Sequence, residues 1–166
     1  MAGMRLGVLV PLEENPQESI HTVRELGFPT CQVGCWQPAR MTQQSARELR
    51  QAADAAAIEI TSMWVGTPGL HAWNFVDGPR TIGLVPEETR AGRLAVLKHG
   101  ADFAAWAGVS GITTHIGFIP EDPGDPAYDP IVATLRELAA YCQAKGRDFW
   151  FETGQETPIT LLRTIE

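Results

Sequence analysis

Hydrophobic residues in this chain alternate between short continuous runs and longer stretches in which they recur every three or four positions. The short runs predict strands at residues 5–10, 30–35, 58–65 and 111–116, with a fifth in the aromatic stretch that begins at Phe149. The helical spacing predicts helices that begin at Asn15-Pro16 and that span 45–57, 87–107, 131–145 and 158–166. Five strand–helix repeats with apolar strands indicate a parallel sheet covered by helices.

The connections differ in length, and this difference narrows the fold class. Residues 66–85 and 117–130 form long loops that each follow a strand, whereas the returns from helix to strand are short. Barrels of eight β/α units build their sites from loops at the carboxyl ends of the strands, and they typically need about 250 residues. No unit carries a G-x-G-x-x-G pattern or a P-loop. We therefore predict an α/β fold of the (β/α)8 TIM-barrel type, incomplete, with residues 1–166 forming a single partial-barrel domain of about five units.

Composition excludes several classes of partner. The chain has 166 residues, a net charge of −7 and no basic run, which argues against a nucleic-acid surface. No apolar run approaches the roughly 18 residues of a membrane span, and we expect neither a membrane partner nor a secretory leader. Cys31, Cys35 and Cys142 lack a regular disulfide framework, so we expect reduced thiols and a cytoplasmic location.

Two candidate catalytic residues stand at the predicted ends of neighbouring strands. Glu152 ends the aromatic strand Phe149–Phe151, and His115 ends the strand before it. Ionised carboxylates are rarely buried without a partner, so a terminal acid on such a strand favours a metal ligand or a general acid/base. Adjacent strand ends lie about 5 Å apart, and the two side chains are therefore expected at one site. The alternatives are a helix cap or solvated acid for Glu152, and a hydrogen-bonded structural residue for His115.

Residues in the neighbouring loops are candidates for binding a substrate. His71, Trp36 and Trp73 are expected at the same end of the sheet, and Gln155 follows Glu152 closely. Aromatic side chains suit the apolar faces of sugar rings, although they could equally cover the end of the sheet. Gln155 and Glu156 could line the pocket or cap the last helix.

The remaining polar residues are assigned simpler roles. His21 and His99 fall within predicted helices and are expected to be structural or solvated. Three acids of the proline-rich loop are expected to be solvated, because the prolines keep that loop extended; they are Glu121, Asp122 and Asp125.

Two segments of the chain resemble a known family. His115-Ile116-Gly117-Phe118-Ile119-Pro120-Glu121-Asp122 and Phe151-Glu152-Thr153-Gly154-Gln155-Glu156, preceded by Gly7-Val8, resemble the xylose isomerase-like TIM-barrel superfamily. The sugar phosphate isomerase/epimerase branch is the nearest. The resemblance implies a divalent metal (Mn²⁺, Mg²⁺, Co²⁺ or Zn²⁺) bound by acids and a histidine at the ends of strands 5 to 8. Glu152 matches the strand-5 metal ligand, which in epimerases also serves as acid/base. The family's ligands from strands 6 to 8 have no counterpart in these 166 residues.

The resemblance implies metal-assisted aldose–ketose isomerisation or epimerisation of a sugar or sugar derivative, with Glu152 and His115 as the site residues. The missing ligands leave activity of this chain alone as an open question. A second hypothesis is a non-catalytic partial barrel that serves as a binding or assembly module. A third, less favoured hypothesis is an endonuclease IV-like phosphodiesterase, which needs many histidines and a DNA surface. Because a half-open barrel exposes apolar surface, we also expect a homo-oligomer that covers the open edge.

Overall fold

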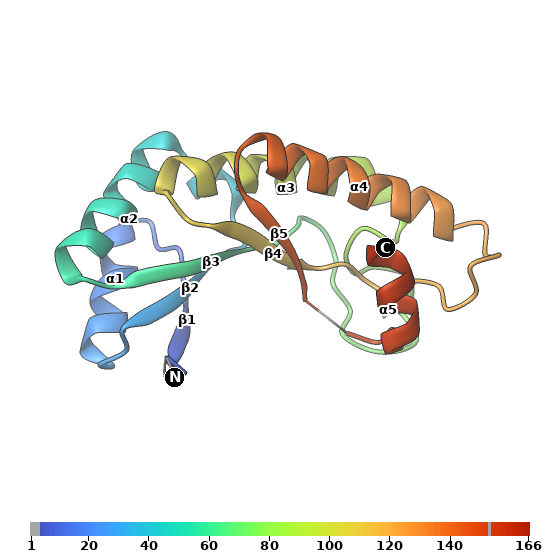
Figure 1. Ribbon diagram of the computed structural model, residues 1–166, viewed down its shortest axis with the longest axis horizontal. Helices are drawn as coiled ribbons and strands as arrows, with labels where there is room; N and C mark the ends of the chain where they lie inside the picture. The colour runs from blue at the N-terminus through green and yellow to red at the C-terminus, as the bar shows by residue number, and fades with distance from the viewer. Residues whose placement is uncertain (1–3, 153) are drawn as a thin grey trace.

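Five parallel strands lie in sequential order in one sheet, β1-β2-β3-β4-β5 (Figure 1). The structure is a computed structural model and describes residues 4–152 and 154–166. The strands are β1 (Gly7–Pro11), β2 (Thr30–Cys35), β3 (Glu59–Val65), β4 (Gly111–His115) and β5 (Asp148–Glu152). The helices are α1 (Pro16–Glu25), α2 (Gln43–Ala56), α3 (Glu87–Ala107), α4 (Tyr128–Ala144) and α5 (Pro158–Ile165), with short 3-10 turns at Pro38–Arg40 and Gly78–Arg80. The predicted alternation of five strands and five helices is confirmed.

Helices cover one face of the sheet. Figure 1 shows α1 to α4 as a continuous layer along one side, while α5 lies beyond the carboxyl end of β5. The side chains that point into this layer are fully buried, among them Val33, Met63 and Ile112. Burial of such apolar side chains is the main favourable term in folding. The sheet and its helix layer therefore contain the hydrophobic core.

The opposite face of the sheet is more polar. Because side chains alternate along a strand, the strand register assigns Gln32, Ser62 and Thr113 to this face together with Trp64. Gln32 donates a hydrogen bond to Ser62 across β2 and β3 at 2.6 Å. In a closed barrel such a face would line the interior.

Most predicted boundaries agree with the structure, and the main exception is α4. Its start was expected at residue 131, but the helix begins at Tyr128. Pro130 was placed in the loop, yet it lies in the first turn, where a helix requires no backbone N–H donor. α2 also begins earlier than expected, because Thr42 and Ser45 form a capping box at its start.

None of the helices in the described part of the chain combines the length and apolarity needed to cross a membrane. Cys31, Cys35 and Cys142 are buried free thiols. Burial raises the pKa of the Cys31 and Cys142 thiols to about 11, which disfavours their reactive thiolate form.

The approach of the loop after β3 to the loop after β4 depends on one glycine. Gly83 has φ +69°, and a Cβ there would overlap the carbonyl of Ile116. We predict that Gly83→Ala lowers the free energy of unfolding by about 2–4 kcal/mol, since strain and overpacking add. Gly92→Ala is the matched control, because Gly92 lies within α3 with open space around its Cα. The Gly92→Ala substitution should raise the free energy of unfolding by about 0.5–1 kcal/mol. Urea unfolding of both variants checks this, and equal stabilities would contradict it.

Candidate functional site

The candidate site lies where the strands end. The β4–β5 register sets His115 directly opposite Glu152. Trp36 follows the last residue of β2, and Trp64 is the penultimate residue of β3. Parallel strands bring all their carboxyl ends to one edge of a sheet, and this is why residues so far apart in the chain meet here.

Glu152 is held by a tryptophan that the sequence analysis did not single out. The indole Nε1–H of Trp64 donates a hydrogen bond of 2.7 Å to Oε2 of Glu152. The bond crosses β4, which lies between the two strands. In the sequence, Trp64 looks like any aromatic residue of a strand; only its strand parity, shared with Ser62, could have assigned it to the site face.

His115 is buried, and its hydrogen bond determines which nitrogen carries the proton. The backbone N–H of Gly117 donates to Nδ1 at 3.0 Å, so the neutral ring bears its hydrogen on Nε2. Burial lowers the pKa of His115, while the charges of Glu152 and Glu156 oppose this shift. The neutral imidazole is thus an Nε2–H donor. Gly154 packs against this side of the ring, since a Cβ there would lie 2.7 Å from Cε1.

A cavity of about 130 Å³ adjoins His115. Its wall combines three indoles, two imidazoles, two threonine hydroxyls and small or apolar residues: Trp36, Trp64, Trp73, His71, His115, Thr67, Thr114, Gly66, Ile82 and Gly83. Trp73 meets the His115 ring edge-on, with centroids 5.2 Å apart. Three of the four residues predicted to bind substrate therefore line one cavity with His115.

His71 differs from His115 in that both of its ring nitrogens form hydrogen bonds within its own loop. Nδ1 of His71 donates to the carbonyl of Gly69, and Nε2 accepts from the hydroxyl of Thr67, each at 3.0 Å. Burial lowers the pKa of His71, and the positive charge of Arg93 lowers it further. Both ring nitrogens are thus engaged in hydrogen bonds within the loop, and His71 contributes mainly the face of its ring to the cavity wall. A direct role for His71 in binding stays a prediction.

The loop that carries His71 and Trp73 is anchored by hydrogen bonds from a buried arginine, Arg93 of α3. Arg93 of α3 is only 1% exposed, and its guanidinium donates to the carbonyls of Pro68, Leu70 and Gly83. Burial lowers the pKa of Arg93, and the three carbonyls offset the cost of removing the charge from water. This anchor makes the long loop a fixed wall of the cavity.

Gln155 is exposed in the turn between β5 and α5. The expectation that Gln155 or Glu156 could cap α5 is not what the structure shows, because Thr157 caps that helix and Glu156 accepts from the backbone N–H of Gly154.

The expectation that Glu121 is merely solvated is wrong in one respect. Its carboxylate accepts from Thr157 N–H and from the hydroxyls of Thr157 and Thr160. These bonds lower the pKa of Glu121 and tie the proline-rich loop to α5.

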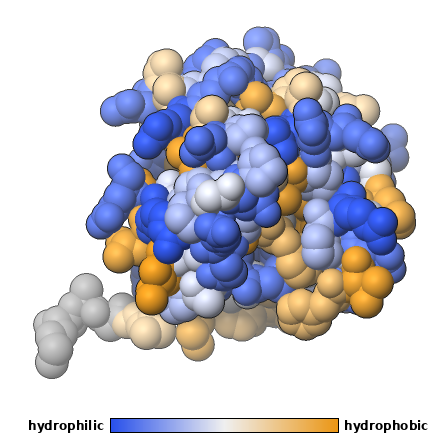
Figure 2. Space-filling view, turned by 90° about the vertical axis from the view of Figure 1, so that its right-hand side faces the viewer, coloured by the Kyte–Doolittle hydropathy of each residue, from blue (hydrophilic) through white to orange (hydrophobic). Residues whose placement is uncertain are grey.

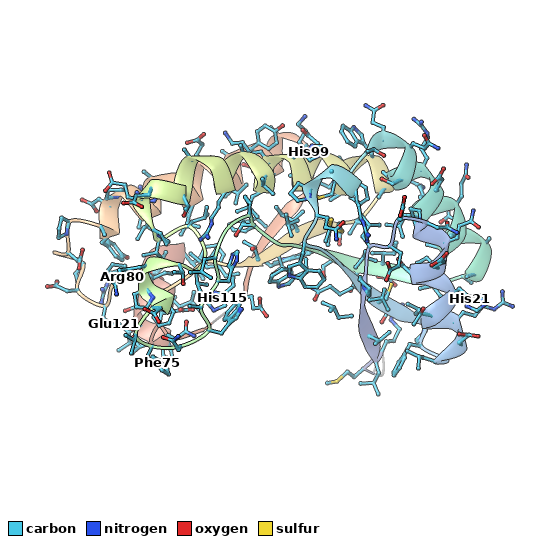
Figure 3. The ribbon with its side chains drawn as sticks, turned by 180° about the vertical axis from the view of Figure 1, so that it is seen from behind. His21, Phe75, Arg80, His99, His115 and Glu121 are labelled. Atoms are coloured by element: carbon cyan, nitrogen blue, oxygen red, sulfur yellow. The ribbon has the colours of Figure 1, made fainter. Side chains whose placement is uncertain are left out.

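Figure 3 shows the spread of the labelled side chains. His115, Glu121, Phe75 and Arg80 lie toward one end of the molecule, whereas His21 lies on α1 at the other end and His99 lies on α3. His21 pairs with Glu25 at 3.5 Å, and His99 stacks edge-on with Trp106. Neither histidine is near the candidate site.

The described residues do not form a complete metal site. Among residues 4–152 and 154–166 there is no group of three His, Cys, Asp or Glu side chains that could hold an ion. One oxygen of Glu152 already accepts from Trp64, and Nε2 of neutral His115 carries a hydrogen. Divalent ions need about four to six ligands, so this donor set does not fit a metal by itself.

Comparison with known proteins finds one family model, the xylose isomerase-like TIM barrel, which matches residues 20–166. No protein of curated function matches the sequence. A xylose isomerase domain protein from Planctomyces limnophilus is 34% identical with a TM-score of 0.84, over 97% of this chain and 57% of that chain. This chain therefore spans a little over half the length of that relative.

Two more distant structures share the fold. A D-psicose 3-epimerase, solved in the presence of D-fructose, is 16% identical with a TM-score of 0.60, over 88% of this chain and 51% of that chain. A xylose isomerase-like TIM barrel protein from Mycobacterium smegmatis, in complex with magnesium, is 18% identical with a TM-score of 0.63, over 90% of this chain and 51% of that chain.

The lowered pKa values of His71 and His115 predict a pH dependence of stability. Both histidines have an ordinary pKa of 6.5, and the unfolded chain binds protons there that the folded protein does not. The free energy of unfolding should thus be highest above pH 6.5 and fall as the pH drops below it. Urea unfolding at several pH values should show this slope, and His71→Gln with His115→Gln should make it shallower. An unchanged slope would contradict the assignment; His21→Gln, at an exposed site, is the control.

Proposed function

Because the chain belongs to the xylose isomerase-like TIM barrel family, we propose that it acts on a sugar as an isomerase or epimerase. The observation that carries the proposal is the pairing of Glu152 with His115 across neighbouring strand ends, beside a cavity lined by tryptophans. A carboxylate next to a neutral N–H donor suits proton abstraction from a carbon beside a carbonyl.

The proposed step uses one oxygen of Glu152 as the base. Glu152 takes the proton from the carbon next to the sugar carbonyl, and the electron pair of that C–H bond moves to form an enediolate. The Nε2–H of His115 donates a hydrogen bond to the oxygen on which negative charge develops. Return of the proton from Glu152 to the neighbouring carbon, with transfer of the hydroxyl proton to the other enediolate oxygen, gives isomerisation. Epimerisation requires a proton from a second acid on the opposite face of the same carbon.

A metal in this family would polarise the carbonyl. The described residues do not supply a ligand set for such an ion, and the proposed step uses only Glu152 and His115.

The substrate is proposed to be an unphosphorylated ketose or a related sugar. The lining of the cavity contains no lysine or arginine side chain to pair with a phosphate. The D-psicose 3-epimerase solved with D-fructose supports a keto-sugar as the first compound to try. Buried reduced thiols fit a cytoplasmic enzyme.

We further propose that two copies associate through the open side of the partial barrel. β5 is an edge strand, and a groove of about 430 Å³ beside it has an apolar lining from α4, β5 and α5 that includes Phe149, Trp150 and Ile165. Hydrophobic side chains also gather along the lower side of the face shown in Figure 2. An apolar surface of this kind beside an unpaired edge favours association.

The activity is tested by exchange of hydrogen for deuterium. NMR of D-fructose in D₂O, with Mn²⁺ or Mg²⁺ supplied, should show loss of the proton on the carbon beside the carbonyl in the presence of the protein. Glu152→Gln should reduce this rate by about a hundredfold or more, because the variant lacks the base. Glu88→Gln removes an exposed acid of α3 and should keep the rate. Equal rates for the wild type and Glu152→Gln would refute the role of Glu152; no exchange by the wild type would refute the activity on this sugar.

The association is tested by light scattering at micromolar concentration. The wild type should have twice the chain mass of 18.1 kDa, and Ile165→Glu should shift it to the monomer, since a charge would enter the apolar groove. Leu26→Glu, at an exposed apolar residue after α1, should leave the dimer intact. A monomeric wild type would overturn the proposal.

A further inference from the structure

We propose that Trp64 is the positioning residue for Glu152. Its indole N–H fixes Oε2 and leaves Oε1 as the oxygen that exchanges protons with the substrate. This inference deepens the proposed function and rests on it, because it assigns separate tasks to the two oxygens of the base.

The hydrogen bond has only one possible direction. Indole Nε1–H is a donor and never an acceptor, so Glu152 must accept. The distance of 2.7 Å is at the short end for an N–H···O bond, as expected when the acceptor is a carboxylate. A proton on Oε2 would compete with the indole N–H for that oxygen, whereas a proton on Oε1 leaves Oε2 free to accept, so the bond also directs the proton to Oε1.

The strand register explains how Trp64 reaches across a strand. Trp64 stands opposite Thr113 on β4, and Thr113 stands opposite Trp150 on β5. Glu152 lies two residues beyond Trp150 and so points to the same face of the sheet. A long side chain on β3 can therefore cover Thr113 and meet the carboxylate.

Trp64 is itself held in place by a second indole. Trp36 packs against Trp64 with ring centroids 5.1 Å apart and the planes tilted by 32°. Two glycines make room for Trp36, since a Cβ on Gly34 or on Gly66 would lie 2.6 Å from its ring. The contacts thus run from Gly34 and Gly66 through Trp36 and Trp64 to Glu152. With Trp64 confined, the carboxylate at its N–H is confined as well.

Confinement of a catalytic carboxylate affects the chemical step more than binding. A base that samples fewer orientations spends more time aligned with the C–H bond, and small misplacements can reduce rates by up to about a hundredfold. Both indoles line the cavity, but only Trp64 bonds Glu152, so removal of Trp36 should weaken substrate binding instead. The two tryptophans therefore predict different kinetic effects.

The first test is the indole resonance of Trp64 in a ¹H–¹⁵N NMR spectrum. The chain has five tryptophans, and the signal missing from Trp64→Phe identifies the Trp64 N–H. In Glu152→Gln this signal should move upfield, because a neutral amide is a weaker acceptor than a carboxylate. A purely structural Trp64 would not respond to Glu152, and an unmoved signal would overturn the proposal. Glu88→Gln should leave the signal in place.

The second test is the kinetics of the exchange reaction. Trp64→Phe keeps an aromatic ring in the cavity wall but removes the N–H donor, so kcat should fall about ten- to a hundredfold with KM within about twofold. Trp36→Phe should mainly raise KM. An unchanged kcat in Trp64→Phe would contradict the positioning role. If the wild type shows no exchange, the proposed function fails, and the NMR signal alone then decides whether Trp64 holds Glu152.

Discussion

The common direction of the five strands is the constraint on which the rest of the structure depends. Parallel strands in sequential order bring every carboxyl end to the same edge, and each helix returns the chain to the opposite edge. For this reason Trp36, Trp64, His115 and Glu152, spread over more than a hundred residues of sequence, can share one site. The helix-facing side chains supply the stability, and the other face of the sheet remains available for polar and aromatic groups.

Two sets of hydrogen bonds, one buried at Arg93 and one solvent-exposed at Glu152, convert this edge into a defined site. Arg93 binds three carbonyls of the loop after β3 and so fixes the wall that carries Trp73 and His71. Trp64 holds the carboxylate of Glu152, which lies opposite His115 on the neighbouring strand. Neither interaction is a salt bridge; each uses a donor with fixed geometry to hold an oxygen acceptor. The same pattern recurs at Glu121, which joins the loop after β4 to the start of α5.

The order of strands and helices could be predicted from the sequence, because apolar periodicity and capping residues are local signals. It also predicted that His115 and Glu152 would be opposite each other, since their positions at strand ends follow from the alternation alone. It missed Trp64, Arg93 and Glu121 as residues that shape the site. Each of these residues forms hydrogen bonds to partners that lie 10 or more residues away in the sequence. Such contacts depend on strand register and loop path, which no local pattern encodes.

The central claim is that Glu152 and His115 act together on the carbon and oxygen of one sugar carbonyl. A crystal structure of the protein with D-fructose bound tests it most directly. We expect the carbon beside the carbonyl at about 3–3.5 Å from Oε1 of Glu152, the distance of a reactive pair. The carbonyl oxygen should lie within hydrogen-bond reach of Nε2 of His115. A sugar bound at the strand ends with its carbonyl turned away from both side chains would contradict the account.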